Sequence, residues 1–242
     1  MIMTTRRALV TGGTRGIGAA ICKALKQAGY KVCATYAGNE EAAKKFETET
    51  GIKTFKWDVS NFNECQTGIK EAETYLGGNI EILVNNAGIT RDGMMHKMTF
   101  ENWNAVIQTN LNSVFNMSRS VIEKMRENKF GRIISMSSVN AHGMTGQTNY
   151  SAAKAGIEGF TKALALEGAR NGVTVNAIAP GYMNTEMVAA VPPEAMQQIL
   201  AKVPANRLGD TTEIARTVVF LADDNAGFIT GAVIPVNGGL RV

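Results

Sequence analysis

A glycine-rich turn lies near the start of the chain, where residues 11–18 read TGGTRGIG. It follows a short apolar run and opens a helical pattern, so the glycines at 12, 16 and 18 stand where a backbone must turn tightly. At such a helix N-terminus, backbone amides can bind phosphate oxygens. The spacing is GxxxGxG rather than the commoner GxGxxG. The turn therefore predicts a strand–turn–helix unit that either binds a phosphate or is a purely structural connection.

Strand-like and helix-like apolar runs alternate along the whole chain, with no long linker between them. Val, Ile and Ala dominate the strand-like runs, as they do in strands buried within a parallel sheet. Right-handed crossovers between such strands build an open sheet with helices on both faces. We therefore expect a single α/β domain over 1–242, with a Rossmann-type doubly wound parallel sheet of about seven strands. The strand-like runs occupy 6–12, 31–36, 52–58, 80–86, 131–138, 173–180 and 232–238, and helical patterns begin near Gly16, Glu40, Asn63, Phe100, Thr148 and Thr211.

The region 183–206 interrupts this alternation. Pro192, Pro193 and Pro204 stand around a short amphipathic helical pattern. Long connections inside compact α/β domains usually serve function. We therefore predict a lid-like insertion at 183–206 that covers the site.

Composition narrows the class of ligand. The chain carries 25 basic and 21 acidic residues, a formal charge of +4, and the basic residues are scattered. Nucleic-acid binding usually shows a basic stripe with interleaved aromatic residues, so this mild excess favours an anionic small molecule instead. A hydrophobic content of 45% argues against disorder.

The three cysteines indicate a reducing compartment. Cys22, Cys33 and Cys65 are an odd number without a CxxC pair, so we expect neither a disulfide framework nor a zinc site, and no metal. The first residues lack the apolar segment of a signal peptide, and no run of about eighteen apolar residues occurs. We expect a cytoplasmic protein that does not span a membrane.

The second strand bears on the choice of nucleotide. NAD enzymes of this architecture usually end that strand with an acidic residue that holds the ribose hydroxyls. Here the position is Tyr36, so no carboxylate repels a 2′-phosphate, and Arg15 in the glycine turn could pair with one. We therefore favour NADP(H) over NAD(H). Arg15 could also be a solvated loop cation.

Two further strand ends carry polar groups. Asp58 ends the third strand, where its carboxylate could accept the adenine amino group or cap the next helix. The fourth strand ends in NNAG at 85–88, where a glycine lets backbone lie close to a flat ring. By itself NNAG could be only a turn.

The fifth strand and the helix after it carry chemically useful side chains. Ligands of doubly wound sheets bind at the carboxyl ends of strands, so Ser137 or Ser138 could face a substrate, although serine is also a common turn former. Tyr150 and Lys154 are four residues apart, which places both on one face of a helix. A nearby ammonium would lower the pKa of the phenol and make it a proton donor or acceptor for a carbonyl oxygen. A surface pair without function would have the same spacing.

These motifs occur in one order, and the chain resembles the short-chain dehydrogenase/reductase family along essentially its whole length. The resemblance runs from TGGTRGIG through NNAG, TNL, SS and YSAAK to PGYMNTEM and the closing NGG. It implies that Tyr150 is the acid and base of catalysis, while Lys154 lowers its pKa and holds the nicotinamide ribose. It implies that Ser138 steadies the substrate carbonyl, and that Asn110 bends its helix and holds a water in the proton relay.

The resemblance also implies a set of binding residues. The residues expected to contact the cofactor are Gly12, Gly13, Thr14, Arg15, Gly16, Ile17, Gly18, Tyr36, Asp58, Val59, Asn86, Ala87, Gly88, Ile89, Thr90, Tyr150, Lys154, Pro180, Gly181, Tyr182 and Met183. The residues expected to contact the substrate are Asp92, Ser138, Gln147, Tyr150, Gly181 and Tyr182.

One feature departs from the family pattern. Ser138 and Tyr150 are twelve positions apart, one fewer than is common in the family. Either the loop between them is one residue short or Ser137 is the catalytic serine. The second serine of the pair is the usual one, which favours Ser138.

Within the family, ITRD, SSVN, GQTNY and PGYMNTEM are most similar to acetoacetyl-CoA reductases of polyhydroxybutyrate synthesis. This implies NADPH-dependent reduction of acetoacetyl-CoA, an acyl-CoA thioester, to (R)-3-hydroxybutyryl-CoA by a homotetramer. A 3-oxoacyl-(acyl-carrier-protein) reductase is the alternative, for which Lys129 and Arg170 could dock the carrier. A non-catalytic NADP-binding module is a further alternative, although such proteins usually lose the serine, tyrosine or lysine.

Overall fold

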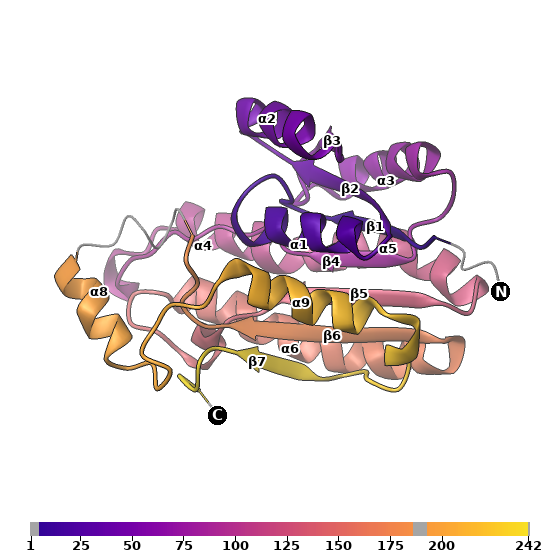
Figure 1. The fold of residues 1–242 in the computed structure, drawn as a ribbon. Coiled ribbons are helices and arrows are strands. Elements are labelled where there is room, and N and C mark those ends of the chain that lie inside the picture. Colours follow the sequence, from indigo (N-terminus) through magenta and orange to yellow (C-terminus); the bar gives the residue numbers. More distant parts are fainter. Residues whose placement is uncertain (1–4, 186–192, 242) are drawn as a thin grey trace.

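The computed structural model, which describes residues 5–185 and 193–241, contains a seven-stranded parallel sheet (Figure 1). The strands lie in the order β3-β2-β1-β4-β5-β6-β7. The order reverses between β1 and β4, which is the crevice where doubly wound sheets bind ligands. The strands are β1 (Arg7–Val10), β2 (Lys31–Tyr36), β3 (Lys53–Lys56), β4 (Ile82–Asn85), β5 (Gly131–Met136), β6 (Val173–Pro180) and β7 (Val233–Val236).

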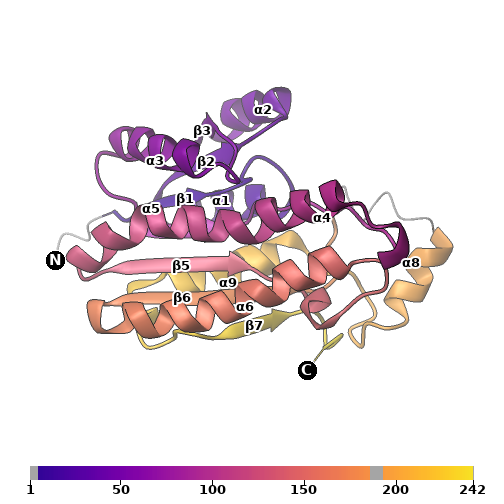
Figure 2. The same ribbon diagram turned by 180° about the vertical axis from the view of Figure 1, so that it is seen from behind.

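Helices cover both faces of this sheet. Figure 1 shows α1 and α9 in front of the strands, and Figure 2 shows α5 and α6 on the opposite face. Helices α1 and α9 pack against each other, and α3 packs against α5. The helices are α1 (Gly16–Gln27), α2 (Glu40–Thr50), α3 (Phe62–Leu76), α4 (Phe100–Ile107), α5 (Ser113–Glu127), α6 (Thr148–Gly168), α8 (Pro193–Leu200) and α9 (Thr211–Ala222).

The sheet separates two apolar layers. One contains Ile21, Leu25 and Val218 beneath α1 and α9, and the other contains Met117 and Val121 beneath α5. Every residue of β5 and β6 is buried, which explains their continuous apolar character. The sheet is therefore a rigid platform, and loops at its carboxyl edge can position polar side chains.

All seven predicted strands and the predicted doubly wound class are confirmed. The predicted helix starts agree with the structure to within one residue. The helical pattern from Phe100, however, is divided into α4 and α5 by a π-helical turn, η2 (Gln108–Asn112). The described residues also form four short 3-10 segments, namely η1 (Met95–Lys97), η3 (Val139–His142), η4 (Ala169–Asn171) and η5 (Asp224–Ala226).

The predicted insertion at 183–206 is only partly visible. Residues 186–192 lie outside the described residues, and the short helix expected in this region is α8. Within the described ranges, no helix is both long and apolar enough to cross a membrane.

Candidate active site

The predicted site residues follow the carboxyl ends of six parallel strands. Because parallel strands end at one edge of the sheet, the loops after β1 to β6 gather there. The glycine turn with Gly13, Thr14, Arg15 and Ile17 follows β1, Tyr36 ends β2, and Asp58 and Val59 follow β3. Asn86, Ala87, Gly88, Ile89, Thr90 and Asp92 follow β4, Ser138 follows β5, and Pro180, Gly181, Tyr182 and Met183 end or follow β6.

The glycine turn forms an anion-binding geometry at the start of α1. Gly12 and Gly16 have φ angles of 61° and 52°, which favour glycine. A Cβ on Gly18 would overlap the carbonyl oxygen of Gly12 and lie 2.6 Å from Nδ2 of Asn86. Arg15, exposed at the N-cap, makes no side-chain cap in the described structure, and the first turn holds no acidic residue. The first amides of α1 are therefore suited to an anion.

Asn86 ties the glycine turn to the loop after β4. Its Nδ2 donates to the carbonyl oxygens of Thr11 at 2.9 Å and Gly12 at 3.1 Å. In return, the Thr11 hydroxyl oxygen accepts from the backbone amides of Asn86 and Ala87, both at 3.0 Å. The side chain of Asn86 thus shapes the cradle through the protein's own backbone.

Asp58 does not cap the following helix. Its Oδ1 accepts from the amide of Ser60 at 2.9 Å, and Asn61 caps α3 instead. The Asp58 side chain is exposed, whereas Val59 is buried and its carbonyl accepts from Asn116 Nδ2 at 3.0 Å. The capping alternative is therefore wrong, and Asp58 stays available to a ligand at the end of β3.

Tyr150 and Lys154 meet at the carboxyl end of β5. Lys154 is 4% exposed, and its Nζ lies 5.4 Å from the centroid of the Tyr150 ring. The ammonium donates to the carbonyl oxygen of Met136 at 2.6 Å. Burial lowers the pKa of Lys154 to about 8. At neutral pH it is therefore mostly charged yet able to release a proton.

The pKa of Tyr150 differs from the expectation. Burial raises it, a hydrogen bond with Ser138 lowers it, and the Asp92 carboxylate raises it further. Lys154 is not among the groups that shift this pKa; its ammonium donates to the carbonyl of Met136 and lies over the face of the ring. Tyr150 is accordingly protonated at neutral pH, which is the form that a proton donor requires.

The two serines after β5 have different partners. The hydroxyl of Ser137 donates to Glu158 Oε1 at 2.7 Å and approaches the carbonyl of Lys154 at 3.3 Å. Ser138 hydrogen-bonds Tyr150, and its Oγ accepts from the amide of Asn140 at 3.1 Å. This geometry favours Ser138 as the serine of the site, because Ser137 is engaged by α6.

Asn110 lies within the π-helical turn and is 1% exposed. Its Oδ1 accepts from the amide of Ile89 at 2.8 Å, and its Nδ2 donates to the carbonyl of Ile89 at 2.9 Å. A Cβ on Gly88 would lie 3.2 Å from Asn110 Oδ1 and 3.8 Å from Lys154 Nζ. The helix is irregular at this position, and the side-chain amide of Asn110 holds the loop after β4 in place.

The expected substrate residues form two groups. Gln147 Nε2 donates to Asp92 Oδ2 at 2.8 Å, which joins the loops before α6 and after β4. The backbone carbonyl of Tyr182 accepts a hydrogen bond from the amide of Gly209 at 2.9 Å. The next residue, Met183, forms an isolated parallel β-bridge with Gly209. A Cβ on Gly181 would lie 2.8 Å from Cα of Asn237, so that loop packs closely on the chain after β7.

Two asparagines of the site were not predicted from the sequence. Asn149 is fully buried, its Oδ1 accepts from the amide of Tyr150 at 2.7 Å, and its Nδ2 donates to the carbonyl of Arg91 at 2.8 Å. Asn140 donates through its backbone to Ser138 and through its side chain to Gln147. The only signal in the sequence is their position within the motif segments SSVN and TNY.

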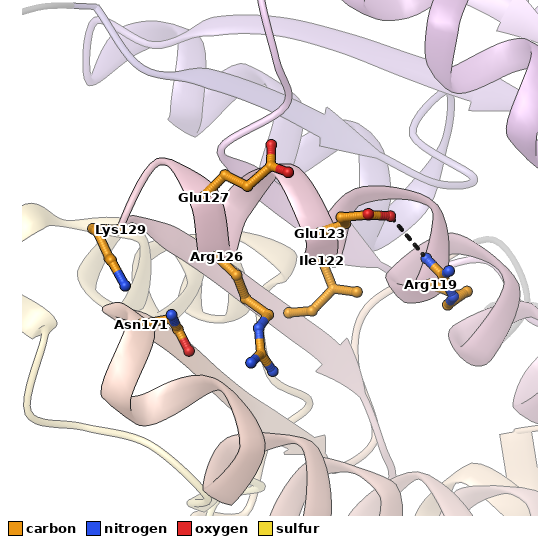
Figure 3. A pocket seen from close by; sticks show the side chains of 7 residues that line it. All are labelled: Arg119, Ile122, Glu123, Arg126, Glu127, Lys129 and Asn171. Carbon is orange, nitrogen blue, oxygen red and sulfur yellow. Dashed lines mark ion pairs between the residues drawn. The ribbon is translucent and has the colours of Figure 1, made fainter.

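A hollow of the described surface lies elsewhere. It encloses about 500 Å³ beside α5 and η4 (Figure 3), at the end of the sheet where β5 and β6 begin. Lys129 lines it, and Arg170 lies in η4. Both therefore lie at the edge opposite Tyr150, not at the mouth of this chain's site. A smaller cavity of about 80 Å³ lies beside Tyr182 and Met183.

The cysteines and acidic groups of the described residues form no disulfide or grouped metal ligands. Cys22, Cys33 and Cys65 are free and buried. In the part of the chain that the structure describes, no three His, Cys, Asp or Glu side chains are grouped to hold a metal ion.

Comparison with known proteins places this geometry in context. A family model described as enoyl-(acyl carrier protein) reductase matches residues 12–241. The acetoacetyl-CoA reductase of Shinella zoogloeoides is 60% identical over 97% of this chain and 98% of its own, and that of Paracoccus denitrificans is 58% identical over 96% and 97%. The 3-oxoacyl-(acyl-carrier-protein) reductase of Haemophilus influenzae is 45% identical over 98% and 99%.

Proposed function

The chain belongs to the short-chain dehydrogenase/reductase family, and from this premise we propose that it reduces acetoacetyl-CoA to (R)-3-hydroxybutyryl-CoA with NADPH. Such a reaction needs a group that gives a proton to the carbonyl oxygen as hydride reaches the carbon. The observation that carries the proposal is the placement of Ser138 and Tyr150 together at the end of β5, with the buried ammonium of Lys154 over the Tyr150 ring.

A dinucleotide phosphate fits the turn after β1. Side chains are excluded at Gly18, the φ angles at Gly12 and Gly16 are positive, and the first turn of α1 lacks an acid that would repel an anion. We propose that this turn holds the pyrophosphate and that Arg15 pairs with the 2′-phosphate. The exposed Arg15 and the absence of a carboxylate at Tyr36 support NADP(H) over NAD(H).

In the proposed mechanism, each protein group has one task. The nicotinamide, when bound, supplies the hydride. Ser138 donates a hydrogen bond to the substrate carbonyl oxygen, which fixes the carbonyl and stabilises its developing negative charge. Tyr150, protonated at neutral pH, gives its proton to that oxygen. The ammonium of Lys154, with a pKa of about 8, can supply the replacement proton.

The choice of acetoacetyl-CoA rests on the relatives. Proteins that share 58–60% identity over nearly their whole length carry the name acetoacetyl-CoA reductase. A carrier-protein thioester is the second candidate, because the Haemophilus influenzae reductase is 45% identical. Lys129 and Arg170 offer that carrier no basic surface near this chain's own site, since they lie at the opposite edge of the sheet. The hydroxyl of Tyr182 is suited to a polar acyl or pantetheine group.

We propose further that the enzyme is a single-domain homotetramer in the cytoplasm that serves polyhydroxybutyrate synthesis. Phe115 on α5 and Leu166 on α6 are 52% and 83% exposed, and Phe228 is fully exposed after α9. Large exposed apolar side chains of this kind favour contact with further copies of the chain. Light scattering that gives a single chain mass of 25.9 kDa in solution would contradict the tetramer.

The test of function is NADPH oxidation with two matched substrates. Acetoacetyl-CoA and acetoacetyl-carrier protein are compared at equal concentrations, and NADH replaces NADPH in a parallel series. We expect kcat/KM to be higher for acetoacetyl-CoA and for NADPH. A large preference for the carrier protein would transfer the assignment to the second candidate.

A further inference from the structure

A chain of hydrogen bonds links the serine of the site to the polar pair at its mouth. The amide of Asn140 donates to Ser138 Oγ at 3.1 Å, and Asn140 Nδ2 donates to Gln147 Oε1 at 3.0 Å. Gln147 Nε2 then donates to Asp92 Oδ2 at 2.8 Å. Four residues from the loops after β4 and β5 are thereby connected, and Asn140 is the one that contacts both ends.

The direction of the two bonds between side chains follows from Asp92. A carboxylate accepts only, so Gln147 must turn its Nε2 toward Asp92. Its Oε1 then faces Asn140, which must donate a hydrogen bond to it through Nδ2. An oxygen at that position of residue 140 would leave two acceptors facing each other. The amide of Asn140 therefore holds Gln147 in the orientation that Asp92 imposes, which a carboxylate at position 140 could not do.

We propose that Asn140 is a positioning residue that holds the Gln147–Asp92 pair in this donor and acceptor arrangement for the thioester substrate, an inference that rests on the proposed function. With Asn140 in place, Gln147 keeps a second Nε2 proton to donate, and Asp92 Oδ1 accepts no bond from the described residues. The pair thus presents one donor and one acceptor to a substrate group. Loss of the arrangement weakens substrate binding.

The backbone contact to Ser138 makes this role separable from catalysis. The bond to Ser138 comes from the backbone amide of Asn140, so a changed side chain leaves it in place. Asn140→Asp should therefore raise KM for acetoacetyl-CoA about tenfold while kcat stays within about threefold. Binding of NADPH, followed by its fluorescence, should not change. A purely structural role would instead lower kcat and NADPH binding together with stability.

A second substitution tests the donor-to-acceptor direction of these hydrogen bonds. In Asn140→Asp, the Gln147 amide can turn its Nε2 to residue 140, which leaves Oε1 facing Asp92. Asp92→Asn then supplies a donor to that Oε1 and restores a continuous chain in the reverse direction. We expect the double variant to have a KM at least about threefold below that of Asn140→Asp. Asn140→Ala should raise the KM about threefold. Because alanine places no oxygen opposite Gln147, adding Asp92→Asn to this variant should not lower its KM.

Controls separate charge and folding from the proposed role. Asn128→Asp makes the same chemical change at an exposed position where α5 ends, before β5 begins, and should leave all constants unchanged. Far-UV circular dichroism and the thermal midpoint report folding, and Asn140→Ala replaces Asn140→Asp if the latter is unfolded. An unchanged KM in that variant then contradicts the proposal.

The possible outcomes distinguish this inference from the proposed function. If the wild-type enzyme reduces acetoacetyl-CoA but Asp92→Asn does not lower the KM of Asn140→Asp, the inference is overturned and the function stands. If the wild type is inactive on acetoacetyl-CoA, the proposed function fails. The same variants are then measured with acetoacetyl-carrier protein, where rescue supports the inference and its absence overturns it.

Discussion

Replacement of Lys154 by methionine should remove activity and stabilise the fold. The side chain is 4% exposed and carries a charge that burial disfavours. Methionine has a similar length and no charge to desolvate. The buried ammonium of Lys154 thus destabilises the fold but is needed for activity, as is common at functional sites.

The size of the effect follows from the pKa. A fall from 10.5 to about 8 corresponds to about 3 kcal/mol, at about 1.4 kcal/mol for each unit. Lys154→Met also leaves the carbonyl of Met136 without its 2.6 Å donor, which costs about 1–3 kcal/mol. We therefore expect Lys154→Met to raise the free energy of unfolding by about 1 kcal/mol at pH 7.

The effect should depend on pH in one direction. Between pH 8 and 10.5 the unfolded chain keeps a proton on Lys154 that the folded chain has lost, so wild-type stability gains from this group as pH rises. At pH 7 both states are protonated, and the full cost remains. The advantage of Lys154→Met should therefore shrink, and then reverse, as pH rises from 8 toward 10.5.

Urea unfolding followed by circular dichroism at pH 7 and pH 10 measures this difference. Protein concentration is held constant, because association changes apparent stability. Taking wild type minus variant cancels titration of the other groups, and Lys23→Met on the exposed side of α1 is the matched control. A difference that does not change with pH would refute the reasoning.

Two further substitutions test the cofactor end. Gly18→Ala should weaken NADPH binding at least about tenfold and destabilise the fold by about 1–3 kcal/mol, because its Cβ would overlap the Gly12 carbonyl. Equilibrium binding and urea unfolding measure the two effects, with Lys23→Ala on the same helix as the control. Normal values for Gly18→Ala would contradict a phosphate site at this turn. Arg15→Ala should weaken NADPH binding about tenfold and leave NADH binding nearly unchanged. Fluorescence titration with both nucleotides checks this. An equal loss of affinity for the two nucleotides would exclude Arg15 as the partner of the 2′-phosphate.

The sheet was predictable because each of its strands is a contiguous buried run. Strands β5 and β6 are buried at every position, so their apolar sequences predict them without tertiary information. The break between α4 and α5 was not predictable in this way. The segment QTNLN keeps a helical pattern, and its π-helical turn accompanies long-range bonds from Asn110 to Ile89.

The site was predictable where helical spacing determines it. Four residues of helix bring Tyr150 and Lys154 onto one face, whatever the rest of the fold does. The pKa of Tyr150 was not predictable, because it depends on burial, on the hydrogen bond with Ser138 and on the Asp92 carboxylate. Asn140 was missed for a similar reason, since its two partners become neighbours only when the loop before α6 folds back on itself.

The central claim is that Tyr150 gives the proton in carbonyl reduction. The most direct measurement compares NADPH oxidation with acetoacetyl-CoA in wild type and Tyr150→Phe, together with NADPH binding to both proteins. We predict that kcat falls about a hundredfold to ten-thousandfold in the variant, while the dissociation constant of NADPH changes less than about threefold. Turnover near the wild-type rate in Tyr150→Phe would contradict the account.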